Sequence, residues 1–118
     1  MAVDRALPEF FGDRATQDPE TGAITFYPQD LTSNATPPRW PALVGVGPHT
    51  AESVMLSLVL RTGERQDTSN DSQLAIAGPD ISLSSRSVDG VMKTAMVYLF
   101  QMQVVNVFEA MMPNPSLI

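Results

Sequence analysis

The sequence contains no cysteine and only one histidine, His49. The missing thiols exclude disulfide bonds, thiol catalysis and cysteine-bound metals, and one imidazole excludes a metal site built from several histidines. No apolar run reaches the roughly 18 residues that a membrane-spanning helix needs. The first ten residues include Asp4 and Glu9 and have no apolar core, so no secretory signal peptide is expected.

Charge is also scarce, because charged residues make up only 17% of the 118 residues. Seven basic residues against 13 acidic ones give a net charge of −6, which disfavours a general electrostatic nucleic-acid binder. The apolar share of 43% is enough for one modest core. A single domain of this size leaves much surface exposed, so the low charge indicates that part of this surface meets another chain.

Patterns typical of catalysis or cofactor binding are missing as well. His49 lies in a Gly-Pro loop with no nucleophile beside it, and the acidic pairs Asp18/Glu20 and Asp67/Asp71 lie in polar turns. The glycines do not match either common phosphate-binding spacing. We therefore expect neither an enzyme nor a metal or cofactor site.

Proline and glycine are concentrated before residue 49, which disfavours a long helix there. Two short apolar stretches around a polar turn predict a β-hairpin over residues 7–28. After a polar loop that ends at Trp40, residues 42–46 form another short apolar run.

The middle of the chain alternates. Apolar residues occupy the even positions from Val54 to Leu60, which predicts a strand over 52–61 with one face in a core. A polar run over 62–72 predicts a turn, and residues 73–77 alternate again up to Gly78-Pro79, with 80–83 continuing the strand past a bend. Residues 84–90 are predicted to form a polar loop.

The segment 91–112 contains neither glycine nor proline and is apolar on nearly every side. One interpretation is a single buried helix; the other is a strand over 91–103 followed by a helix over 104–112. Its valine, threonine and aromatic residues favour the strand, whereas its methionine and alanine favour the helix. The methionines in this block fill a core or form an interface between copies.

Four short motifs, taken in order, carry a resemblance to a known family: Gly-Asp-Arg-Ala-Thr (12–16), Ile-Thr-Phe-Tyr-Pro-Gln-Asp-Leu (24–31), Leu-Arg-Thr-Gly (60–63) and Val-Met-Lys-Thr-Ala-Met (91–96). In this order and spacing the chain resembles the coat protein of single-stranded RNA bacteriophages, the leviviruses.

The resemblance implies an α+β fold: a hairpin over 7–28, an antiparallel sheet of about five strands over 42–103 and a short C-terminal helix over 104–112. It further implies dimers with joined sheet edges and interlocked helices. Such dimers assemble in the bacterial host cytoplasm into an icosahedral shell, the virion capsid, around single-stranded RNA.

The resemblance also implies roles for individual residues. The candidates for RNA binding are Arg61, Ser57, Gln73, Lys93, Thr94 and Tyr98. The candidates for the dimer interface are Met96, Phe100, Met102, Val105, Phe108, Met111 and Met112. The candidates for a loop between dimers are Arg86, Ser87 and Asp89.

An alternative from a different class is a small phage interaction protein, for capsid decoration or head–tail joining, with no RNA binding. In that hypothesis the C-terminal block is one long helix that packs against a partner.

Overall fold

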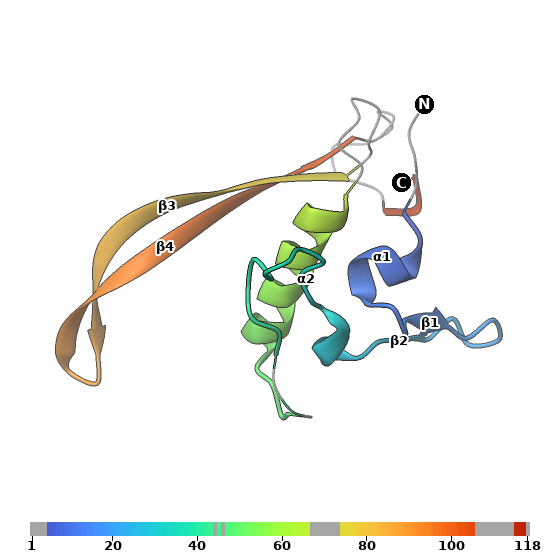
Figure 1. Ribbon diagram of the computed structural model, residues 1–118, viewed down its shortest axis with the longest axis horizontal. Helices are drawn as coiled ribbons and strands as arrows, with labels where there is room; N and C mark the ends of the chain where they lie inside the picture. The colour runs from blue at the N-terminus through green and yellow to red at the C-terminus, as the bar shows by residue number, and fades with distance from the viewer. Residues whose placement is uncertain (1–4, 44, 46, 67–73, 106–114, 118) are drawn as a thin grey trace.

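The computed structural model describes residues 5–43, 45, 47–66, 74–105 and 115–117 (Figure 1). Within them the fold is α+β, with two antiparallel two-stranded sheets and no larger sheet. The elements in chain order are α1 (Leu7–Phe11), β1 (Thr16–Gln17), β2 (Ile24–Thr25), the 3-10 turn η1 (Pro28–Asp30), α2 (Ala51–Arg65), β3 (Leu74–Val88), β4 (Val91–Val104) and the 3-10 turn η2 (Pro115–Leu117).

The strand predicted over 52–61 is wrong, because these residues form the body of α2. Met55 and Val59 are apolar as well as the even-numbered residues, so the run also fits the apolar stripe of a helix. A cap signal precedes it: the Thr50 hydroxyl accepts a hydrogen bond of 3.1 Å from the Ser53 N–H. This cap satisfies one of the free N–H groups at the helix start.

The hairpin predicted over 7–28 is confirmed only in its centre, where β1 pairs with β2. Residues 7–11 form α1 instead, since Pro8 suits the first turn of a helix, where no N–H is needed. The Asp18 carboxylate closes the hairpin turn by accepting hydrogen bonds from the N–H groups of Glu20 and Thr21.

A long twisted hairpin, the β3–β4 ribbon, makes up the C-terminal half (Figure 1). The strand predicted over 91–103 is confirmed as β4, which excludes the single-helix alternative for these residues. The polar loop predicted over 84–90 is wrong, because β3 runs to Val88. Only Asp89 (φ 52°) and Gly90 (φ 78°) make the turn, and Asp-Gly is a preferred pair for such a turn.

Two further predictions concern a sheet over 42–103 and a helix over 104–112. The sheet of about five strands predicted over 42–103 is not formed by the described residues, because 51–65 is helical and only β3 and β4 pair there. Val104, the first residue of the predicted helix 104–112, belongs to β4. Residues 106–112 lie outside the described residues.

A one-residue bulge in β3 keeps the ribbon's pattern consistent. The register shifts between Ala77 and Asp80, where three residue steps along β3 lie opposite two residue steps along β4. Upstream, Ile76 faces Met102; downstream, Ile81 faces Tyr98. The bulge thus places the even-numbered apolar residues before it and the odd-numbered apolar residues after it on the same face of the ribbon.

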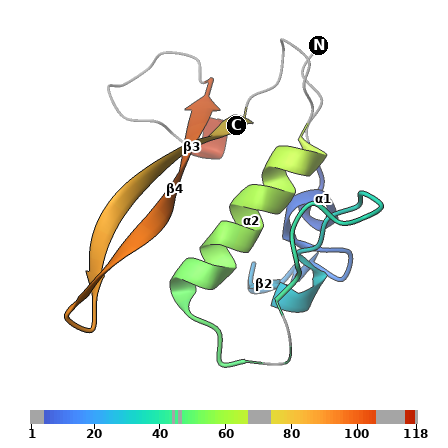
Figure 2. The same cartoon turned by 60° about the vertical axis from the view of Figure 1, so that its left-hand side comes forward.

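The arrangement leaves a small core. In Figures 1 and 2 the ribbon stands on one side of α2, and α1 lies on the other. Among the described residues, Leu31 and Ala15 are the buried hydrophobic side chains, and Arg61 is as fully buried as Leu31. Neither α1 nor α2 is long and apolar enough to cross a membrane.

A substitution at Gly78 tests the importance of the bulge for stability. Its φ of 111° disfavours any side chain, and an added Cβ would lie 2.6 Å from the Leu99 carbonyl oxygen. We expect Gly78→Ala to lower the free energy of unfolding by at least about 2 kcal/mol, measured by urea denaturation.

Gly90→Ala is the matched control. Gly90 also has a positive φ of 78°, but nothing lies within 4 Å of its added Cβ. This variant should lose only about 1 kcal/mol. Equal losses for both variants would contradict a steric role for Leu99.

Candidate functional site

The register of the ribbon sorts its side chains into two faces, because residues directly opposite each other point to the same side. One face, here called the apolar face, carries no charged residue. It consists of Leu74, Ile76, Ile81, Leu83, Ser85 and Ser87 from β3, and of Met92, Thr94, Met96, Tyr98, Phe100, Met102 and Val104 from β4. The other face, the polar face, holds the ribbon's Asp80, Arg86 and Lys93.

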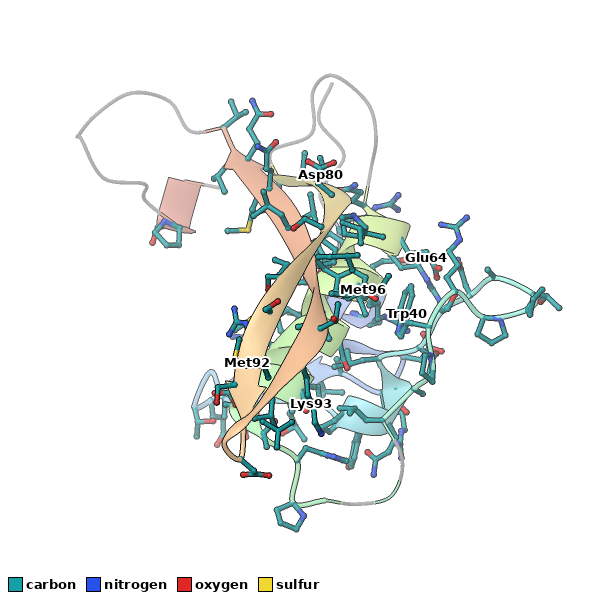
Figure 3. All side chains as sticks on the ribbon, turned by 90° about the vertical axis from the view of Figure 1, so that its left-hand side faces the viewer. Trp40, Glu64, Asp80, Met92, Lys93 and Met96 are labelled. Atoms are coloured by element: carbon teal, nitrogen blue, oxygen red, sulfur yellow. The ribbon has the colours of Figure 1, made fainter. Side chains whose placement is uncertain are left out.

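The apolar face is largely uncovered. Leu83, Met92 and Met102 are 69%, 66% and 67% exposed, and Figure 3 shows Met92 and Met96 along the ribbon. Ile81, Met96 and Tyr98 are also exposed. Contiguous exposed apolar surface of this kind marks an interaction site. An isolated two-stranded hairpin is also marginal in water, so the outer part of the ribbon gains little stability from the described residues alone.

The ribbon edges are free over most of their length. Among the described residues, β3 and β4 have no strand neighbour except each other. At the base of β3 the Gln66 side chain occupies the edge: its Nε2 donates to the Ile76 carbonyl at 2.8 Å, and its Oε1 accepts from the Ile76 N–H at 2.7 Å. Further along, unpaired backbone groups remain available for another strand.

Where the apolar face meets α2, the two enclose a half-open cavity of about 650 Å³. Ile76, Tyr98 and Phe100 line it from the ribbon, and Leu56 lines it from α2. Trp40 forms a further wall, and its buried Nε1–H has no acceptor in the described structure. The cavity is therefore an extension of the apolar face towards α2.

Glu64 fastens the loop that carries Trp40 to α2. Its carboxylate, 4% exposed, accepts hydrogen bonds from the Ser33 hydroxyl (2.7 Å) and the Asn34 N–H, and Arg39 lies 3.9 Å away. Burial raises the pKa of Glu64, but these hydrogen bonds and the nearby Arg39 charge lower it by more. The pKa of Glu64 therefore lies below its ordinary value, and the carboxylate stays ionised while it holds the loop.

Arg61, a predicted RNA-binding residue, lies in the interior and binds its own chain. Its guanidinium donates to the carbonyls of Pro8 (2.8 Å), Glu9 (2.9 Å) and Asp30 (2.7 Å), with a longer bond to Thr32, and to the Asp13 carboxylate (3.1 Å). In this conformation all three guanidinium nitrogens are engaged. Arg61 thus joins α1, η1 and α2 at one point.

The other predicted RNA-binding residues do not gather in one place. Ser57 is buried in α2, where its hydroxyl donates to the Ser53 carbonyl. Lys93 lies on the polar face of the ribbon, whereas Thr94 and Tyr98 lie on the apolar face. Gln73 lies outside the described residues.

Three of the four predicted dimer residues that are described fall on one surface. Met96, Phe100 and Met102 share the apolar face, and Val105 follows β4 and is exposed. Phe108, Met111 and Met112 lie outside the described residues. The residues predicted to form a loop between dimers separate: Arg86 is on the polar face, Ser87 on the apolar face and Asp89 in the turn.

The two cations on the ribbon, Arg86 and Lys93, have no carboxylate partner among the described residues. Arg14, Arg39, Arg61 and Arg65 each pair with an acidic residue of the described chain. Arg86 and Lys93 instead lie directly opposite each other on the polar face, a like-charge pair that disfavours the ribbon unless an anion joins it. The sequence resemblance implied separate roles for these two residues, and their pairing was not predicted.

The described residues contain no cluster of three or more acidic or histidine side chains placed to hold a metal ion. Comparisons with protein-family models, with curated proteins and with solved structures find no match to this chain.

Arg61→Lys tests the buried junction. Lysine keeps the charge but cannot reach three separate backbone carbonyls and a carboxylate in the same plane. We expect a loss of about 3 kcal/mol in the free energy of unfolding, because buried carbonyls lose their donors. Arg65→Lys, whose single partner carboxylate, Glu9, lies 3.6 Å away and is 40% exposed, should lose less than about 1 kcal/mol. Similar losses for both would contradict the junction.

Because the pKa of Glu64 is lowered in the folded chain, the free energy of unfolding depends on pH. A carboxylate with a folded-state pKa below its unfolded value of about 4.3 stabilises the fold above that value. This stabilisation is lost as the pH falls through the lower, folded-state pKa. Glu64→Gln should therefore be less stable than the wild type at pH 7, and the difference should shrink below about pH 4.

Thermal unfolding followed by circular dichroism at several pH values measures this. The control is Glu52→Gln, since Glu52 is exposed in the first turn of α2. A Glu64→Gln deficit that is the same at every pH would contradict the assignment.

Proposed function

We propose that this chain is a self-assembling structural protein: a coat subunit that forms homodimers and then an icosahedral shell around single-stranded RNA. The observation that supports this most is the uncovered apolar face of the ribbon, which the described part of the chain covers only at its base. A surface of this kind is stable in water only when another molecule covers it.

The free ribbon edges support assembly beyond a dimer. A face can be covered once by one partner, whereas an unpaired edge offers backbone donors and acceptors to a further chain. A subunit with both features has two separate kinds of contact. Closed shells need at least these: one contact that makes the building block and another that joins the blocks.

The RNA part of the proposal depends on Arg86 and Lys93. Phosphate groups are the anions that such a side-by-side pair suits, and many copies in a shell would multiply a weak contact. The pair is exposed and has no carboxylate partner in the described structure. The resemblance of the sequence motifs to levivirus coat proteins agrees with this proposal, which places the protein in virions.

The competing proposal is a small phage interaction protein without RNA. Its particular form, one long C-terminal helix against a partner, does not fit β4, which is extended over Val91–Val104. A decoration or joining protein would bind to another protein's assembly and would not form particles by itself.

Expression of the chain alone tests the proposal. We expect closed particles in negative-stain electron microscopy, with nuclease-protected RNA in the purified fraction. Leu83→Asp should abolish the particles, because it places a charge on the apolar face. Ser82→Asp, at the neighbouring residue on the polar face, should keep them.

Each other outcome has a defined meaning. A wild-type chain that stays monomeric would refute the coat proposal. Particles without nucleic acid would support the shell and refute the RNA part. Loss of particles in both aspartate variants would refute the role of the apolar face.

A further inference from the structure

We infer that the dimer forms by stacking two ribbons, with the apolar face of one copy packed on the apolar face of the second about a two-fold axis near Met96. This inference rests on the proposed self-assembly and specifies its first contact. It differs from the joined-edge dimer implied by the sequence resemblance, because here the edges stay free.

Charge favours a second copy as the occupant. The apolar face has no charged side chain from Leu74 to Ser87 or from Met92 to Val104. Two such faces can meet without burying any charge, which would cost several kcal/mol per ion. The polar faces cannot pair in this way, since stacking them would bury Arg86 and Lys93.

The outline of the ribbon face supplies roughly half of the area that a stable dimer takes from each partner. The 14 residues of β4 at about 3.3 Å each, and two strands about 4.8 Å apart, give a flat outline of about 45 by 10 Å. Side-chain relief raises the accessible area above this outline. The wall of α2 beside it, where Leu56 is 49% exposed, adds to the surface, and a stable interface takes about 800 Å² from each partner.

The cavity beside α2 offers space for the tip of the partner's ribbon. With the axis at Met96, residues equally far on either side of it face each other. Met92 of the second copy then lies over Phe100 of the first, which lines the cavity. A methionine side chain suits such an irregular apolar space and makes favourable contacts with aromatic rings. The same geometry brings the two Met96 side chains together.

The absence of cysteine permits a clean test by crosslinking. We compare single-cysteine variants Met96→Cys and Leu99→Cys. Both positions are 56% exposed in the single chain, but Leu99 faces Asp80 on the polar face. A short bis-maleimide should convert Met96→Cys to covalent dimer at least tenfold faster than Leu99→Cys.

Light scattering coupled to size exclusion gives the second readout. Met96→Asp should shift the dimer–monomer equilibrium towards monomer by at least tenfold in concentration, and Leu99→Asp should shift it little. Far-ultraviolet circular dichroism checks that both variants keep their secondary structure. If Met96→Asp unfolds, the crosslinking comparison still decides, since cysteine is a milder replacement.

The outcomes separate the two proposals. A wild-type chain that never exceeds a monomer refutes the proposed function itself. A dimer that crosslinks equally at both positions, or preferentially at Leu99, refutes stacking by the apolar face. A dimer that crosslinks at neither position refutes the axis at Met96 and overturns the inference.

Discussion

The structure depends on one unmet requirement: the apolar face of a two-stranded ribbon must be covered. A sheet of only two strands has little interior of its own, so its side chains pack only if another layer lies on them. The described chain supplies that layer only at the ribbon base, where Ile76 and Phe100 approach α2. Beyond Ile81 the face is open. Among the described residues, the ribbon is therefore one layer whose outer part has no second layer packed on it.

The N-terminal half is held together mainly by polar contacts and has only a small hydrophobic core. Its buried hydrophobic side chains are few, and the fully buried Arg61 takes the central place that an apolar residue usually occupies. Around it, α1 and η1 are too short to satisfy all their own backbone carbonyls. The guanidinium of Arg61 donates hydrogen bonds to these carbonyls. Arg14 completes the region at the surface by a two-point pair with Asp30, which lowers the pKa of that carboxyl. This half holds its shape by fixed hydrogen bonds, so it can carry the ribbon without a large core.

These features explain which parts could be predicted from the sequence. β4 was predictable because its valine, threonine and aromatic residues favour a strand, although its methionine and alanine residues left a helix open. α2 was mistaken for a strand because alternation was counted on one parity while Met55 and Val59 filled the other; the cap at Thr50 was the signal that could have decided. The serine-rich end of β3 resembled a loop, although Asp89-Gly90 between two valines was a hairpin signal. The burial of Arg61 was not predictable, since its partners Pro8 and Asp30 are distant in sequence and offer only backbone carbonyls.

If a second copy covers the ribbon, the stability of this chain depends on its concentration. When a folded element gains its second layer from another copy, its free energy of folding includes the free energy of association and rises with concentration. The bulge at Gly78 then has a double effect, because it keeps Ile81 and Leu83 on the same face as Ile76. Without it, the outer half of β3 would turn these side chains to the polar face beside Arg86. The apolar face would then be broken in the middle. The backbone conformation of one glycine thus keeps the apolar face continuous.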